Sequence, residues 1–138
     1  VALKVPEWNW IIKLHPSITM QYFKNNFSNM PDNVEVIYDG DILEIVKASD
    51  VMVIFRSTVG LMSIFFYVPL VILDDEGGAL DGIPYDSLGG GKLVTYSDSL
   101  EDAIKEKLEL KKSTAMAPIF YNTPNATNNV INVFKSIL

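Results

Sequence analysis

The sequence contains no cysteine, and it has a single histidine among its 138 residues. Disulfide bonds and thiolate metal sites are therefore excluded, and a reducing, cytoplasmic setting is expected. Long hydrophobic runs are also lacking, because the most apolar stretch, Val59 to Leu73, is interrupted by Pro69 and is too short to span a bilayer. No signal-peptide pattern is expected at the start of the chain. The sequence thus predicts a cytoplasmic protein without a transmembrane segment.

Basic residues are scarce. The chain has 11 lysine and arginine residues against 17 aspartate and glutamate residues, which gives a net charge of −6. Binding to nucleic acid needs clustered lysine and arginine side chains that neutralise phosphates. The one local concentration, from Lys105 to Lys112, also contains Glu106 and Glu109, as expected at the end of a solvated helix. The sequence therefore predicts no nucleic-acid partner.

The composition that remains, with 49% hydrophobic and 20% charged residues, is that of a globular protein. A chain of this length corresponds to one domain, so we expect a single domain over residues 1–138. Short apolar runs alternate with segments of helical periodicity. The expected strands cover residues 10–14, 34–38, 51–55, 70–73 and 92–96, and the expected helices cover residues 18–27, 42–48, 59–67, 99–112 and 126–138. This alternation predicts an α/β fold, a three-layer Rossmann-like parallel sheet of about five strands flanked by helices.

Capping residues mark where several of these helices begin. Ser17 is expected to cap the first helix, and Asp41 with Glu44 resembles a capping box for the second. Ser97 or Ser99 would cap the helix that ends in lysines. The apolar face of the first helix would consist of Ile18, Tyr22, Phe23 and Phe27.

Arg56, Ser57 and Thr58 form a polar turn between the strand at 51–55 and the helix at 59–67. The hydroxyls and the free N–H groups of the first helical turn point into one small volume, where the helix dipole and an arginine favour an anion. In an open α/β sheet this turn lies at the carboxyl edge, where ligands bind. The turn therefore predicts a site for a phosphate-bearing ligand, although an ordinary N-cap explains the two hydroxyls equally well.

Two short motifs, Lys13-Leu14-His15-Pro16 and Ser57-Thr58-Val59-Gly60-Leu61, each follow a predicted strand. Together they resemble the carboxyl-terminal, nucleotide-binding half of GT-B glycosyltransferases, especially the bacterial capsule polysaccharide enzymes and the CDP-glycerol glycerophosphotransferases. Those families carry a His-Pro motif and a Ser-Ser/Thr motif, and both contact the phosphate of the donor nucleotide. The similarity covers residues 10–73, with a weaker echo in residues 125–138.

The resemblance implies the donor nucleotide-binding domain of a glycosyltransferase, which moves a sugar or polyol phosphate in cell-envelope polysaccharide biosynthesis. His15 would be catalytic, because it would stabilise charge on the leaving phosphate. The implied nucleotide- and phosphate-binding residues are His15, Pro16, Arg56, Ser57, Thr58 and Gly60. The activated donor is a substrate, so no cofactor is expected, and no metal either.

The resemblance also implies a partner domain. The general base and the acceptor site would belong to an N-terminal half, so this chain would be a fragment of a larger two-domain protein. The isolated domain is not expected to be active, because the reactants meet between the two halves. Such an enzyme would work in the cytoplasm, in peripheral association with the inner face of the membrane.

Two departures from the family pattern keep other functions open. Met62 and Ser63 stand where the look-alikes have Glu-Ala, and a thioether cannot replace the carboxylate that would bind the ribose hydroxyls. The chain also lacks the strand and helix with which such a half begins. A non-catalytic α/β binding or interaction module that exposes residues 65–67 is therefore an alternative, as is a UDP-GlcNAc 2-epimerase-like domain. A metal role for the acidic run at residues 74–76 is a further hypothesis.

Overall fold

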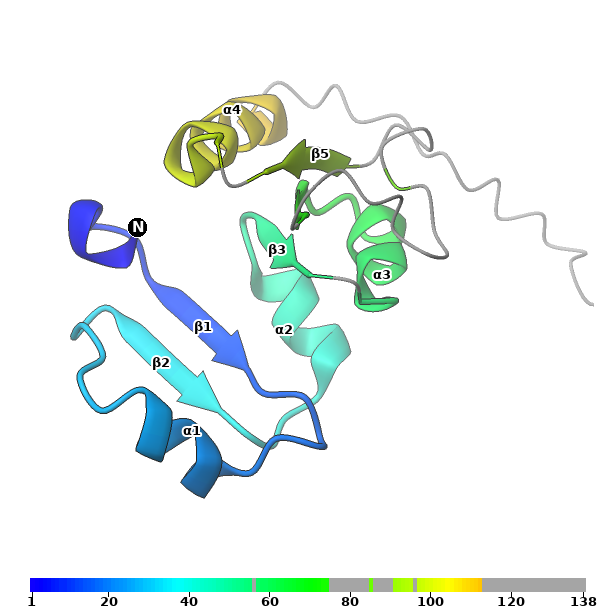
Figure 1. Cartoon of the computed structure of the whole chain (residues 1–138). Coiled ribbons are helices and arrows are strands. Elements are labelled where there is room, and N and C mark those ends of the chain that lie inside the picture. The colour runs from blue at the N-terminus through cyan, green and yellow to red at the C-terminus, as the bar shows by residue number, and fades with distance from the viewer. Residues whose placement is uncertain (56, 75–84, 86–90, 96, 113–138) are drawn as a thin grey trace, which may run out of the picture.

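The computed structural model describes residues 1–55, 57–74, 85, 91–95 and 97–112 (Figure 1). A single 3-10 turn at Ala2–Lys4 precedes the regular elements. The strands of this part are β1 (Trp10–Lys13), β2 (Val34–Ile37), β3 (Met52–Ile54), β4 (Leu70–Leu73) and β5 (Gly91–Val94). The α-helices are α1 (Met20–Asn26), α2 (Ile42–Ala48), α3 (Val59–Phe65) and α4 (Leu100–Lys112). The helix predicted at 126–138 lies outside the described residues.

The strands form two parallel sheets, which confirms the predicted α/β class and strand direction. β1 pairs with β2, while β4 lies between β3 and β5. One sheet of about five strands was predicted, but the structure has a two-stranded and a three-stranded sheet. No hydrogen bond joins β1 to β3 in the part of the chain that it describes. None of the helices in that part is long and apolar enough to cross a membrane.

The three-stranded sheet is covered on both faces, as expected for buried parallel strands. On one face, Ile54, Ile64, Leu70, Ile72 and Tyr85 form a core cluster that includes α3. On the other face, Val71 and Val94 pack against Ala103 and Ile104 of α4. Because successive residues of β4 belong to opposite clusters, the strand's near-continuous hydrophobic sequence is explained by burial on both sides. This sheet and its two helices form three layers.

The two-stranded sheet is less well covered. Of the apolar face predicted for the first helix, Phe23 is buried, but Tyr22 is 60% exposed and Phe27 is 55% exposed. The helix also begins later than predicted, because the Thr19 side chain accepts a hydrogen bond from the Tyr22 N–H and caps α1. Ser17, the predicted cap, instead hydrogen-bonds His15. Ile18 and Phe27 lie outside α1, so the predicted apolar face is confirmed only at Phe23.

The other helix ends follow local capping rules. The Asp41 side chain accepts from the Leu43 N–H and caps α2, while Glu44 pairs with Lys47 instead of completing a capping box. Of the two serines predicted to cap α4, Ser99 does so, since its hydroxyl accepts from the Asp102 N–H.

Helix α3 ends at Phe65, two residues earlier than predicted. Tyr67 has a positive φ of 59°, so the chain leaves the helix through a left-handed residue before it reaches Pro69. The buried Ser63 hydroxyl donates to the Val68 carbonyl oxygen over 2.7 Å and fixes this exit. The result is a tight connection from α3 to β4.

Asp98 joins the end of β5 to the start of α4. Its carboxylate accepts from the N–H and the hydroxyl of Thr95, both over 2.8 Å, and these hydrogen bonds lower the pKa of Asp98 below its ordinary 3.8. A carboxyl group whose pKa is lower in the folded than in the unfolded state stabilises the protein at pH values above the unfolded-state pKa. This stabilisation is lost as the pH falls through the folded-state pKa. We therefore expect Asp98→Asn to lower the melting temperature at pH 7, with a difference that shrinks below pH 3.8. Thermal melts by circular dichroism across this range test it, and a difference independent of pH would contradict it.

Candidate functional site

The two predicted motifs each follow the carboxyl end of a parallel strand. His15 and Pro16 lie just beyond β1, and Ser57 and Thr58 lie just beyond β3. These are the positions at which open α/β folds bind ligands. The two motifs belong to different sheets, and no hydrogen bond between them is present among the described residues. Arg56, the cation predicted to assist Ser57 and Thr58, lies outside those residues.

His15 is exposed and sits at the first position of a turn. Its carbonyl oxygen accepts from the Ile18 N–H over 2.8 Å. Its Nδ1 lies 2.7 Å from the Ser17 hydroxyl and 3.2 Å from the Ser17 backbone nitrogen, whose N–H donates to it. Because Nδ1 is an acceptor, the neutral ring carries its proton on Nε2. The turn therefore prepares an N–H donor at Nε2 for an external acceptor.

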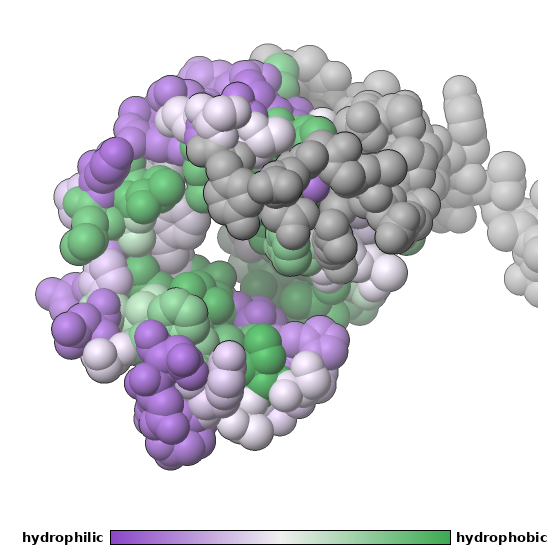
Figure 2. All heavy atoms as spheres, viewed as in Figure 1, coloured by the Kyte–Doolittle hydropathy of each residue, from purple (hydrophilic) through white to green (hydrophobic). Residues whose placement is uncertain are grey.

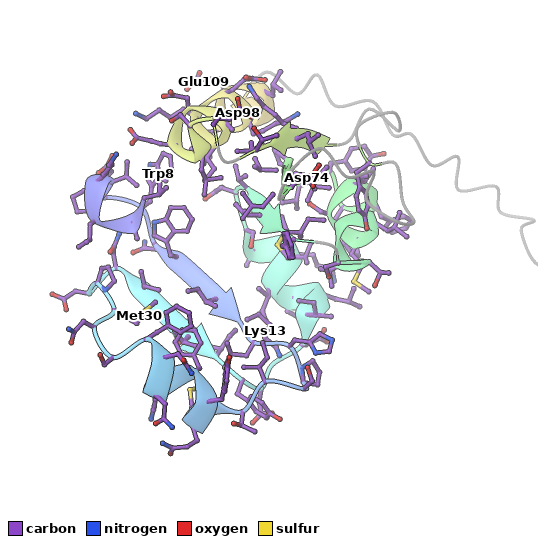
Figure 3. All side chains as sticks on the ribbon, viewed as in Figure 1. Trp8, Lys13, Met30, Asp74, Asp98 and Glu109 are labelled. Carbon is purple, nitrogen blue, oxygen red and sulfur yellow. The ribbon has the colours of Figure 1, made fainter. Side chains whose placement is uncertain are left out.

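Lys13 adds a positive charge at the same strand ends. Its ammonium donates to the carbonyl oxygens of Leu14, over 3.1 Å, and of Tyr38, over 2.6 Å, and so bridges the ends of β1 and β2 (Figure 3). The Tyr38 hydroxyl in turn donates to the Pro16 carbonyl oxygen over 3.3 Å. Lys13 belongs to the first of the two motifs, but it was not among the predicted site residues. Its position two residues before the histidine, at the end of the same strand, was the available signal.

The turn at Ser57 and Thr58 uses one hydroxyl internally. The Ser57 hydroxyl accepts from the Val59 N–H over 3.3 Å, and the Ser57 carbonyl oxygen accepts from the Gly60 N–H over 3.2 Å. Thr58 is the N-cap residue of α3, but its side chain makes no capping hydrogen bond. Ser57 therefore acts as a local cap, and the exposed Thr58 hydroxyl is the one left to contact a ligand.

Tyr85 contacts this turn through its side-chain hydroxyl. Its side chain is 3% exposed, and its hydroxyl donates to the Ser57 carbonyl oxygen over 2.7 Å. Burial raises the pKa of the Tyr85 hydroxyl above 10, so it remains a donor at neutral pH. Tyr85 was not among the predicted site residues, because it is a lone aromatic residue in a glycine-rich stretch without periodicity.

Gly60, predicted to bind phosphate, is buried against the same ring. A Cβ atom at Gly60 would lie 2.8 Å from Tyr85 Cζ and 2.7 Å from Ile54 Cδ1. The absence of a side chain at Gly60 therefore lets Tyr85 reach the turn. This packing explains the glycine, and direct contact between Gly60 and a phosphate stays a prediction.

Asp74 follows β4, the central strand of the larger sheet, and is labelled in Figure 3. It is 5% exposed, and its Oδ1 has no hydrogen-bond partner among the described residues. A buried carboxylate oxygen without a partner is costly, so this strand end is a place where a polar group would be stabilised. The described residues contain no group of three histidine, aspartate or glutamate side chains that could hold a metal ion. The rest of the predicted acidic run, residues 75 and 76, lies outside them.

A separate apolar groove runs between α2 and α3. It has a volume of about 410 Å³ and is lined by Leu43, Leu61, Met62, Phe65 and Phe66. Phe65 is 50% exposed and Tyr67 is 47% exposed, which confirms the predicted exposure at these two positions. Met62, the residue that replaces the glutamate of the look-alikes, thus contributes its thioether to an apolar surface.

The candidate site residues thus lie at the ends of three strands: His15 and Lys13 at β1, Ser57 and Thr58 after β3, and Asp74 after β4. Their hydrogen-bond donors could bind a small anion, and their unpaired carboxylate oxygen could accept from a hydroxyl or amine. No protein-family model, curated protein or solved structure matches the chain.

Proposed function

We propose that the chain is the donor nucleotide-binding domain of a glycosyltransferase that acts in cell-envelope polysaccharide synthesis. The observation that supports this proposal best is the position of both motifs just beyond the carboxyl ends of parallel strands. His15 is exposed and its Nδ1 is hydrogen-bonded to Ser17, so Nε2 is the ring nitrogen that would contact a donor phosphate. In the proposal, the two sheets belong to one Rossmann-like layer within a two-domain enzyme of the GT-B type.

The proposed role of these residues is to bind the phosphate of the donor and to stabilise its negative charge. The Nε2–H of His15 would donate to a phosphate oxygen, and Lys13, at the end of the same strand, would add the positive charge of its ammonium. Thr58 would donate its hydroxyl from the second motif. Charge developing on the leaving phosphate would strengthen each of these bonds, since charge-assisted hydrogen bonds are about twice as strong as neutral ones.

A nucleotide titration tests the proposal. We expect one of CMP, CDP, UMP or UDP to raise the melting temperature, since a ligand at 100 times its dissociation constant adds about 2.7 kcal/mol of stability. For the nucleotide that binds, His15→Ala should weaken affinity about 10- to 100-fold, because it removes a hydrogen bond to a charged group. Isothermal titration calorimetry measures this change.

Two further variants make the result specific. His15→Gln keeps an N–H near the position of Nε2 and should recover part of the affinity. Lys24→Ala removes a lysine from the last turn of α1, away from the strand ends, and should leave affinity unchanged. If none of the four nucleotides changes the melting temperature or releases heat, the proposal is wrong.

The groove between α2 and α3 favours a second candidate, a non-catalytic interaction module. Met62 and the half-exposed Phe65 line an apolar surface without any polar group that could select a nucleotide. Such a module would show no nucleotide binding, but Phe65→Asp would abolish its association with a partner. The titration therefore separates the two candidates, since the nucleotide-binding domain should bind equally well with Phe65→Asp.

A further inference from the structure

Ser17 contacts the imidazole ring of His15 with two different groups. Its hydroxyl oxygen lies 2.7 Å from Nδ1, and its backbone N–H donates to the same nitrogen over 3.2 Å. The neutral ring has only one lone pair on Nδ1, so the hydroxyl and the N–H compete for a single acceptor. The backbone N–H alone is enough to fix the tautomer. The shorter contact, to the hydroxyl, therefore needs another explanation.

The Ser17 hydroxyl is not needed to build the adjoining helix or turn. Thr19 caps α1 by accepting from the Tyr22 N–H, and the turn is closed by the backbone hydrogen bond from Ile18 to His15. His15 and Ser17 are both exposed, and Figure 2 shows hydrophilic residues at the surface beyond the carboxyl end of β1. Removal of this hydroxyl should therefore leave the local fold intact and change only the surroundings of the ring.

The hydroxyl and the N–H of Ser17 respond differently when the ring is protonated. An imidazolium carries a proton on both nitrogens, so Nδ1 changes from an acceptor to a donor. The backbone N–H can only donate, and it would then face a second donor. The hydroxyl can rotate about its C–O bond and accept the Nδ1 proton with an oxygen lone pair. Of the two groups, the hydroxyl is the one that can pair with both forms of the ring.

The other titratable groups near these strand ends bond elsewhere. Lys13 and Tyr38 each donate to backbone carbonyl oxygens, and Asp41 accepts from a backbone N–H at the start of α2. Neither Asp41 nor Asp39 pairs with the ring in the part of the chain that the structure describes. The charge of Lys13, at the end of the same strand, disfavours a second cation until an anion binds. The Ser17 hydroxyl is thus the described group that could accept from an imidazolium.

We propose that Ser17 is a positioning residue, which allows His15 to bind a phosphate as an imidazolium. In the free site the ring is neutral, and Nδ1 accepts from Ser17. When a phosphate dianion accepts from Nε2–H, one proton from the solvent adds to Nδ1, and the Ser17 hydroxyl turns to accept it. The bond from Nε2 is then charge-assisted on both sides, which strengthens it. The phosphate step rests on the proposed function, whereas the pairing of Ser17 with the ring does not.

The single histidine makes this pairing measurable by ¹⁵N NMR in the ligand-free protein. At high pH the proton should be on Nε2. Ser17→Ala should move the midpoint of the ring titration lower by about 0.5–1 pH unit, because the imidazolium loses its acceptor while the neutral ring keeps the N–H donor. Ser17→Thr retains the hydroxyl and should restore the midpoint. Thr19→Ala is the matched control, since it should lower the melting temperature without moving the midpoint. An unchanged midpoint in Ser17→Ala would overturn the proposal.

Calorimetry with CMP, CDP, UMP and UDP tests the phosphate step. Titrations in two buffers of different ionisation enthalpy give the number of protons taken up on binding. Protons that bind to the nucleotide itself contribute equally to both proteins, so the difference between them reports His15. The unsubstituted protein should take up more protons than Ser17→Ala, and its affinity should rise more steeply as the pH falls from about 8 to 6.5, where imidazole titrates.

The outcomes separate this inference from the proposed function. Equal proton uptake and parallel pH profiles for the unsubstituted protein and Ser17→Ala would overturn the inference, although a nucleotide binds. If none of the four nucleotides binds, the proposed function is wrong, and the NMR titration still decides whether Ser17 controls the protonation of His15.

Discussion

Replacing Ile72 with alanine is expected to lower the free energy of unfolding by about 2–5 kcal/mol, as is typical for large-to-small changes in a core. Ile72 is 0% exposed in the central strand β4, where it packs against Ile54, Ile64 and Leu70. The substitution removes three buried carbon atoms and leaves a cavity between β4 and α3, which strands held in a ladder cannot close. Urea denaturation followed by circular dichroism measures the change.

The neighbouring strand offers a matched control. Leu93 of β5 stands opposite Ile72 in the sheet register, but it is 39% exposed. Leu93→Ala should cost about 1 kcal/mol or less, because much of the side chain is already hydrated. Equal losses for Ile72→Ala and Leu93→Ala would mean that the sheet is not covered by α3 in solution.

Replacing Gly60 with alanine is expected to destabilise the protein by about 1–3 kcal/mol, the usual cost of overpacking a core. The new methyl group would lie 2.8 Å from Tyr85 Cζ and 2.7 Å from Ile54 Cδ1. The end of Ile54 can rotate away, but the tyrosine ring is rigid and would have to withdraw. Its hydrogen bond to the Ser57 carbonyl oxygen would then be lost, so the turn that precedes α3 should loosen as well.

A double-mutant cycle separates these effects. If the clash with the ring is the cause, Gly60→Ala should cost less in a Tyr85→Ala background, with a coupling of about 0.5–3 kcal/mol. Chemical denaturation of the four proteins provides the coupling. Additive effects would show that the ring does not press on Gly60, and would remove the packing explanation for this glycine.

Local sequence patterns predicted the elements but not how they assemble. The five strands β1 to β5 were predicted because short apolar runs alternate with segments of helical periodicity, and each of these patterns can be read from neighbouring residues. The gap between β1 and β3 could not be predicted, since pairing depends on groups distant in the chain. For the same reason the helical period predicted an apolar face of Ile18, Tyr22, Phe23 and Phe27 without showing that only Phe23 is buried.

The sequence predicted which strand ends carry the candidate site residues, but not the hydrogen bonds that these residues make. The positions of His15 and Ser57 follow from strands that stop at polar residues. What the hydroxyls and ring nitrogens do was not predictable, because Ser17 could cap α1 or bind His15, and Thr19 was an equally good cap two residues later. Tyr85 shows the same limit, since its contact with Ser57 spans a glycine-rich stretch that no periodic pattern connects.

In the described part of the chain, β1 pairs only with β2 and β3 pairs only with β4, so each of the two strands keeps one edge with unpaired backbone groups. Exposed edges with apolar side chains are templates for pairing with other molecules, so aggregation would begin at such edges and not at the central strand β4, which pairs on both sides. The net charge of −6 opposes such growth by repulsion between molecules. Added salt shortens the range of that repulsion to about 10 Å at an ionic strength of 0.1 M. Low ionic strength would therefore favour colloidal stability during purification.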